Sequence, residues 1–299
     1  MPRLSLVFAV WLLPLFALAA EPVLHRVDSG GHSLAVWEKS PASPRAQILL
    51  LHGRTWSAIP DFDLQVEGED LSFMDGLVEL GYRVYALDAR GYGATERDTS
   101  GWLTPSKAAK DALTVMAWIR QRDSSPLHLY GWSYGSMVGQ LALQRQPQAA
   151  DSIILFGYPW HPDRYPDLSQ LSYPDQPPRE ANTAENAASD FITPGSISQA
   201  AVDAYVKASL EADPVRVDFR DLHEWLELEA PKLVTPTLLI RAEFDPLAPM
   251  AAQMNFFGKL GTADKWYVEL SGGDHAALLE TPRQRMLLAM DAFIRFLSE

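Results

Sequence analysis

The stretch LHLYGWSYGSM, residues 127–137, decides the fold: an apolar run ends abruptly in glycines, and an amphipathic segment follows. Within it, Gly131 to Gly135 matches G-x-S-x-G, a strand-to-helix turn that can carry a nucleophilic serine, here Ser133. Glycine is needed at both positions because a strained turn that lifts a side chain above a sheet leaves no room for a Cβ against neighbouring backbone. Serine and glycine are also common in ordinary turns, so the rest of the chain has to decide between the two interpretations.

Apolar runs and helical patterns alternate along most of the chain. The predicted strands cover residues 23–27, 33–38, 47–51, 83–87, 127–130, 152–156, 237–241 and 265–270. Several are almost unbroken apolar runs, as expected for strands buried on both faces of a parallel sheet. Helical spacing is found in residues 105–121, 134–146, 250–260 and 282–297. This alternation predicts an α/β fold with a mostly parallel, eight-stranded twisted sheet flanked by helices.

Residues 158–230 interrupt the alternation. They are rich in proline and then show helical patterns near 197–211 and 218–229. We interpret them as a helical lid inserted into a core domain of residues 21–157 and 231–299. A long disordered loop, mainly over residues 166–190, is the alternative.

The N-terminus, MPRLSLVFAVWLLPLFALAA, is typical of a secretory signal peptide over residues 1–20. The apolar run contains Pro14 and is shorter than the roughly 20 residues that span a bilayer. We therefore expect an exported protein, periplasmic or secreted, with no stable membrane insertion after cleavage. An uncleaved anchor is the alternative.

Composition excludes several functions. The chain has no cysteine, which rules out disulfides and cysteine metal sites, and we expect no metal and no cofactor. Its net charge of −13 and pI near 5.0 make it a poor partner for nucleic acid, whose phosphates it would repel.

Two further residues complete a candidate catalytic set with Ser133. A serine hydroxyl needs a base, usually a histidine that a carboxylate orients. Of seven histidines, His275 stands in a glycine loop just past the last predicted strand. Asp245 follows the preceding strand, although an acid before a helix can also be a simple cap. Both loops fall at the carboxyl edge of the sheet, where ligands and catalysis collect.

At this point the sequence resembles the α/β-hydrolase superfamily. The resemblance rests on LLLHGRT (49–55), LDARGYGAT (87–95), GWSYGS (131–136) and the Asp245 and His275 loops, which together span residues 48–282. It implies Ser133 as nucleophile, His275 as general base and acid, and Asp245 as its orienting carboxylate, in the chain order of that superfamily. Asp274 departs from the family, in which glycine often precedes the histidine.

The resemblance also implies an oxyanion hole with the backbone N–H groups of Tyr134 and Arg54 as donors. The connection over residues 54–72 is much longer than the roughly two to six residues usual in α/β units. Trp56, Trp132 and Trp160 are candidate walls of the substrate pocket. We interpret the acids of this connection as a solvated face, with a calcium site as the alternative. They are Asp61, Asp63, Glu67, Glu69 and Asp70.

The leading hypothesis is therefore an exported serine hydrolase that cleaves a small-molecule carboxylic ester through an acyl-enzyme. An aminopeptidase of the proline-iminopeptidase type is the alternative, with Glu224, Glu227 and Glu229 as candidate ligands for the substrate amine. A non-catalytic ligand-binding protein on the same fold is a further alternative. Substrate identity and oligomeric state stay open at the level of sequence.

Overall fold

The structure of the protein is a computed structural model that describes residues 21–161 and 167–299. The predicted signal peptide lies outside these residues. Within the described ranges, no helix combines the length and the apolar character needed to cross a bilayer.

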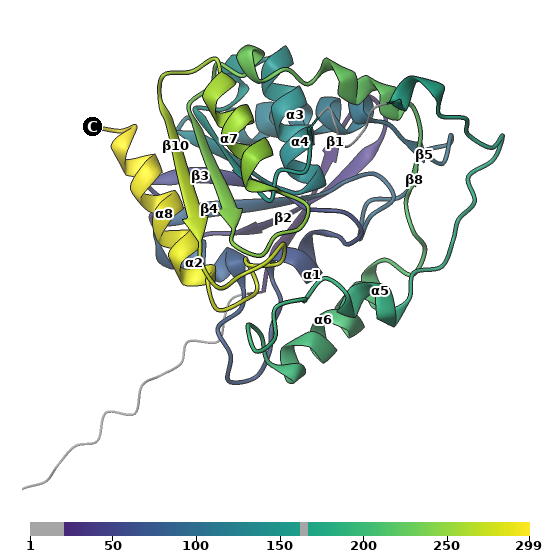
Figure 1. Ribbon diagram of the computed structural model, residues 1–299, viewed down its shortest axis with the longest axis horizontal. Coiled ribbons are helices and arrows are strands. Elements are labelled where there is room, and N and C mark those ends of the chain that lie inside the picture. The colour runs from purple at the N-terminus through teal and green to yellow at the C-terminus, as the bar shows by residue number, and fades with distance from the viewer. Residues whose placement is uncertain (1–20, 162–166) are drawn as a thin grey trace, which may run out of the picture.

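An eight-stranded sheet forms the centre of the molecule (Figure 1). In spatial order its strands are β1 (Val23–Asp28), β2 (Ser33–Lys39), β4 (Tyr82–Asp88), β3 (Ala46–Leu51), β6 (Leu127–Trp132), β7 (Ser152–Phe156), β9 (Thr237–Ala242) and β10 (Lys265–Leu270). The β1–β2 and β2–β4 pairs are antiparallel, and the other neighbours are parallel. The predicted eight-stranded, mostly parallel sheet is confirmed.

Helices cover both faces of this sheet. The long ones are α3 (Pro105–Arg122), α4 (Tyr134–Arg145), α7 (Met250–Lys259) and α8 (Arg283–Phe296), each within two residues of its predicted bounds, and α2 (Phe73–Glu79) is shorter. Figure 1 shows α3, α4 and α7 on one side and α2 and α8 on the other. Helix α3 begins as its sequence predicts: the Thr104 hydroxyl accepts from the Lys107 N–H, and proline follows at the first position.

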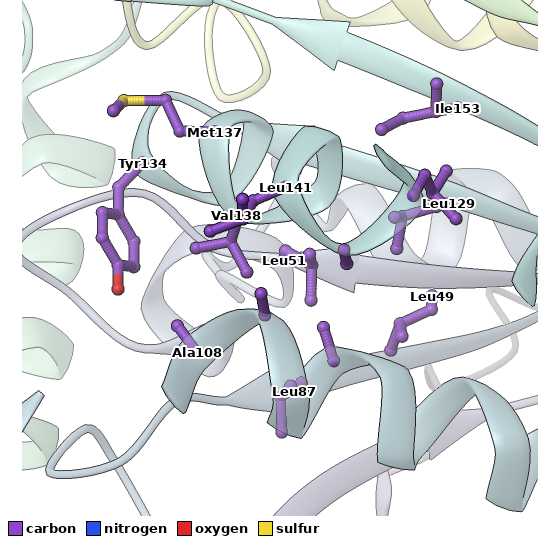
Figure 2. Packing of buried hydrophobic residues seen from close by; sticks show 14 of the residues in the cluster. Leu49, Leu51, Leu87, Ala108, Leu129, Tyr134, Met137, Val138, Leu141 and Ile153 are labelled. Carbon is purple, nitrogen blue, oxygen red and sulfur yellow. The ribbon is translucent and has the colours of Figure 1, made fainter. Parts of the chain in front are cut away.

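Strand side chains alternate between two cores. Leu49 and Leu51 of β3 belong to the core under α3 and α4, whereas Ile48 and Leu50 belong to the core under α2 and α8. Figure 2 shows the first core, in which Leu141 of α4 packs above the strands. All four β3 side chains are buried, which explains why the central strands are unbroken apolar runs.

The inserted segment, residues 158–230, runs from the end of β7 toward β9. It contains α5 (Ala184–Ala188), α6 (Gln199–Ala212), β8 (Asp218–Phe219) and the 3₁₀ helices η3 (Leu168–Gln170) and η4 (Leu222–Glu227). The helix predicted near 197–211 is present as α6. The helical prediction for 218–229 was wrong at its start, because β8 pairs in parallel with β5 (Trp102–Leu103) and η4 follows.

The long connection over residues 54–72 is ordered and carries the short helix α1 (Ala58–Phe62). The interpretation of its acids as one solvated face was wrong for two of them. Asp61 is fully buried and accepts from the Tyr205 hydroxyl of α6, and Asp63 is buried against the Lys39 ammonium at 2.6 Å. Local sequence could not indicate this, because both partners come from distant parts of the chain. No cluster of three or more acidic, histidine or cysteine ligands suited to a metal occurs in the described ranges.

Candidate active site

Ser133 stands at the turn between β6 and α4 in a strained backbone conformation. Its φ of 53° and ψ of −115° place it in a region that L-residues rarely adopt. The Ser133 N–H donates to the Phe156 carbonyl at 2.9 Å, which ties the turn to the end of β7. The turn therefore holds the serine at the carboxyl edge of the sheet, as G-x-S-x-G predicts.

The two glycines of the motif are required by close backbone approach. A Cβ on Gly131 would lie 2.5 Å from the Gly135 carbonyl oxygen, and one on Gly135 would lie 2.1 Å from the Leu51 carbonyl oxygen. Real Cβ atoms do not approach backbone this closely. The glycines thus let α4 begin directly against the end of β3.

His275 and Asp245 meet at the same edge. His275 Nδ1 lies 2.8 Å from Asp245 Oδ2, and the Asp245 side chain is fully buried. The other Asp245 oxygen accepts from the Leu247 N–H at 2.8 Å. Because the carboxylate engages Nδ1, the histidine presents Nε2 as its free nitrogen. In the described ranges no hydrogen bond joins the Ser133 hydroxyl to His275. Catalytic hydrogen bonds are often long or poorly aligned in active sites without substrate.

Gly157 makes room for the histidine ring, and sequence reasoning missed it. A Cβ there would lie 2.9 Å from His275 Nδ1 and Cε1 and 3.2 Å from Asp245 Oδ2. Its φ of 57° is also left-handed, which glycine adopts without strain. A glycine directly after a strand at the carboxyl edge was the available signal.

Trp132 contacts His275 through a hydrogen bond and a ring contact and does not line the pocket. Its Nε1 donates to the His275 carbonyl at 2.8 Å, and the two rings lie 5.7 Å apart. The indole also packs on Gly53, where an added Cβ would lie 3.2 Å from it. Trp56 is likewise buried elsewhere, with Nε1 donating to Asp190 at 3.0 Å.

Asp274 fastens the histidine loop to the inserted segment. Its carboxylate accepts from the N–H groups of Ile192 and Thr193 at 3.0 and 2.7 Å and from Ala276 at 2.9 Å. The Asp274 N–H donates to Glu280, whose other oxygen accepts from the Ser196 hydroxyl at 2.6 Å. Burial raises the pKa of Glu280 to about 7, and the nearby Asp274 charge acts in the same direction. The departure from glycine at position 274 thus has a structural cause.

His52 is a fixed, neutral histidine and not a second base. Its Nδ1 lies 2.7 Å from the Gly53 carbonyl, and its Nε2 accepts from the Ala89 N–H at 3.1 Å. Burial lowers its pKa to about 4. The ring ties the end of β3 to the end of β4.

The sequence predicts the backbone N–H groups of Tyr134 and Arg54 as the oxyanion hole. Tyr134 is the first residue of α4, so its N–H has no acceptor within the helix. Arg54 follows the end of β3, and its N–H donates no hydrogen bond to any residue in the described ranges. Both residues line the same pocket as Ser133.

This pocket has a volume of about 210 Å³. Its walls are Arg54, Ser133, Tyr134, Met137, Pro159, Trp160, Leu168, Phe219, Leu222, Trp225 and Leu247. Of the three tryptophans predicted for the pocket, Trp160 lines it, whereas Trp56 and Trp132 do not. The lining residues from the inserted segment, such as Phe219 and Trp225, could not be chosen from sequence because their placement depends on how that segment folds.

The sheet topology, with Ser133, Asp245 and His275 at its carboxyl edge, defines a hydrolase of the α/β-hydrolase fold. Comparison with protein families agrees: the family model described as serine aminopeptidase, S33, matches residues 42–282. The chain belongs to this family, and it is a serine hydrolase in the general sense that the family implies.

Solved structures with the same fold include proteins of several activities. A serine hydrolase involved in carbazole degradation is 16% identical with a TM-score of 0.64, over 92% of this chain and 99% of that chain. A thermophilic esterase from Thermogutta terrifontis is 17% identical with a TM-score of 0.64, over 93% and 99%. Epoxide hydrolase A from Mycobacterium thermoresistibile is 17% identical with a TM-score of 0.65, over 92% and 98%. At these identities the likeness establishes the fold alone. No curated protein matches the chain.

Proposed function

We propose that this protein is a serine hydrolase of carboxylic esters. The observation that carries the proposal is the pocket beside Ser133, which is mainly apolar and aromatic and to which the described residues contribute no carboxylate. Such a pocket accepts an uncharged acyl group readily, whereas a substrate ammonium group finds no carboxylate partner among the described lining residues.

In the proposed mechanism the Ser133 hydroxyl attacks the ester carbonyl while His275 Nε2 takes its proton. Asp245, held at 2.8 Å from Nδ1, orients the ring and stabilises its charged form. The negative charge on the carbonyl oxygen is stabilised by the N–H groups of Tyr134 and Arg54. His275 then returns the proton to the leaving alcohol, and an acyl-enzyme remains. Water activated by His275 attacks this ester and releases the acid.

A fluorophosphonate probe tests the nucleophile directly. We expect stoichiometric labelling of Ser133, located by peptide mass spectrometry, and loss of labelling and ester hydrolysis in Ser133→Ala. Ser40→Ala, at an exposed serine directly after β2, is the control and should keep both labelling and ester hydrolysis. Ester hydrolysis by Ser133→Ala at the wild-type rate would refute the proposal.

An aminopeptidase of the proline-iminopeptidase type is the second candidate, because the matched family is described as serine aminopeptidase. The acids suggested for the substrate amine are engaged elsewhere: Glu224 accepts from the Ser106 N–H, Glu227 pairs with Arg145, and Glu229 pairs with Lys232. Asp190 is a better candidate, since its charge interacts with His275, but burial raises its pKa to about 6. Faster turnover of aminoacyl-amides than of esters would favour this second function.

A non-catalytic ligand-binding protein on this fold is less well supported. The strained Ser133, the Asp245–His275 contact and the glycines that make room for them would serve no purpose in simple binding. Absence of both probe labelling and turnover would favour it.

We also propose that the protein is exported and that the inserted segment acts as a lid. The signal-like residues 1–20 support export, and the mature chain should then begin near Glu21. N-terminal sequencing of protein from producing cells checks this, and a chain that begins at Met1 or Pro2 would contradict it. Pro159, Trp160, Leu168, Phe219, Leu222 and Trp225 of the segment line the pocket, which supports a lid role.

A further inference from the structure

One charged side chain lines the pocket beside Ser133. It is Arg54, and the other pocket residues that the structure describes are uncharged. Because the protein is acidic overall, a pocket whose described lining holds a cation and no acid is opposite in sign to the net charge of the molecule.

The surroundings of Arg54 leave its guanidinium available. The group lies over the Phe219 ring, 4.7 Å from the ring centroid, and the residue is exposed. No carboxylate in residues 21–161 or 167–299 forms a salt bridge with it, whereas Arg90 and Arg97 each pair with aspartates. Stacking on an aromatic face restrains the guanidinium plane but leaves its N–H edge free to bind a carboxylate through two hydrogen bonds.

The position of Arg54 fixes where such a carboxylate would lie. In the proposed mechanism its backbone N–H contacts the oxyanion, so its guanidinium is within one side-chain length of the scissile carbonyl. A substrate carboxylate at that place must therefore be joined to the carbonyl by a short chain. We propose that Arg54 selects acyl groups that carry a terminal carboxylate, so that the preferred substrates are half-esters of short dicarboxylic acids. This inference rests on the proposed ester hydrolysis.

The test compares substrates that share a chain and differ in terminal charge. Monoethyl glutarate, ethyl pentanoate and ethyl 4-(trimethylammonio)butanoate are followed by acid release, with uncatalysed hydrolysis subtracted. We expect kcat/KM for the half-ester to exceed that for ethyl pentanoate by about tenfold, mainly through KM, and the cationic ester to be poorest. The preference should shrink with added salt because the guanidinium is exposed.

Substitution assigns the preference to Arg54. Arg54→Gln should bring the ratio of the two kcat/KM values close to one, and Arg54→Lys should keep part of it by retaining the charge. Arg122→Gln is the matched control: Arg122 also stacks on an aromatic ring, that of Trp118 at 4.5 Å, but it lies at the end of α3 outside the pocket lining. It should keep the wild-type ratio.

The outcomes separate the inference from the function on which it rests. Hydrolysis of both esters without a preference, or an unchanged ratio in Arg54→Gln, would overturn the inference and leave ester hydrolysis standing. An equal loss of preference in Arg122→Gln would overturn it too, since overall charge would then be the cause. Turnover of no ester would overturn both.

Discussion

At the scale of single residues, the turn around Ser133 depends on positions that carry no functional group. The serine has a left-handed φ, and the motif glycines bring backbone atoms of β3, β6 and α4 into direct contact. The strain at Ser133 therefore persists because its neighbours are packed too closely to let the backbone relax.

Gly135→Ala is expected to be strongly destabilising. The added Cβ would lie 2.1 Å from the Leu51 carbonyl oxygen, and rigid backbone has to move, at a cost of about 3 kcal/mol or more in the free energy of unfolding. Urea unfolding measures this. Gly258→Ala in α7 is the control, because the added Cβ would have no neighbour within 4 Å. This variant should be more stable than wild type by about 0.5–1 kcal/mol, since alanine favours a helix over glycine. Equal stability of the two variants would contradict the argument.

Trp132→Phe should lower kcat about ten- to a hundredfold and leave KM little changed. Phenylalanine cannot donate to the His275 carbonyl, so the histidine loop loses a constraint and the base is less well placed. Steady-state kinetics with a neutral ester are the measurement. Trp266→Phe is the control, since the Trp266 ring packs on Phe293 and Phe296 of α8, and it should retain wild-type kcat.

At the scale of elements, the histidine loop and the inserted segment are joined by buried polar contacts. Asp274 accepts from two N–H groups of the segment, and the Ser196 carbonyl accepts from the Thr281 N–H at 2.8 Å. A movement of the segment at Ile192–Ser196 would therefore disturb the loop that carries His275.

Glu280→Gln should flatten the pH dependence of stability between about pH 4.5 and pH 7. The folded pKa of Glu280, about 7, exceeds its ordinary value of 4.5, so the folded protein binds this proton more tightly. The stabilisation that this proton gives the folded protein is complete below about pH 4.5 and is lost as the pH rises through about 7. Glutamine can accept from the Asp274 N–H through its amide oxygen and donate to Ser196 Oγ through its amide nitrogen, because the Ser196 hydroxyl can donate to the Thr193 carbonyl, and glutamine does not titrate.

The measurement is the free energy of unfolding in urea at about pH 4 and about pH 8, on either side of that range. Wild type should lose more stability over this interval than Glu280→Gln. Glu79→Gln, at an exposed glutamate of α2, serves as the control and should follow wild type. A Glu280→Gln profile parallel to that of wild type would show that this proton does not contribute.

At the scale of the whole molecule, the inserted segment is attached to the core at several separate places. β8 pairs with β5, and Arg97 pairs with Asp218 of β8 at 2.9 Å. Asp213, at the end of α6, accepts from the N–H groups of Ser57 and Gly93, both at 2.8 Å. These attachments lie at the loops that follow β3 and β4, which are core loops of the catalytic edge.

We therefore expect one cooperative thermal transition for the mature protein. Contacts spread over residues 192–219 of the segment couple its unfolding to that of the sheet. Differential scanning calorimetry should give a single peak whose calorimetric and van't Hoff enthalpies agree. Arg97→Gln should move this peak to lower temperature without splitting it. A separate earlier transition would indicate that the segment unfolds alone.

Much of the fold and of the candidate active site could be predicted from the sequence because the ends of the strands can be recognised in it. Ser133, Asp245 and His275 each follow an apolar run, and parallel strands bring such positions to one edge. The roles of Trp132 and Asp274 could not be predicted, since their partners are backbone atoms distant in the chain. The same holds for Asp61 and Asp213, whose burial depends on where α6 lies.

The short β5–β8 pairing has a consequence for how the enzyme can diversify. The pairing uses main-chain groups, and the Asp213 carboxylate binds main-chain N–H groups of the core, whereas the pocket is lined by other side chains, such as Leu168 and Leu222. Attachment and selectivity thus reside in different atoms. A combinatorial library that randomises Leu168, Leu222 and Leu247 should retain the fold while it samples new acyl preferences, which makes this chain a suitable starting point for directed evolution.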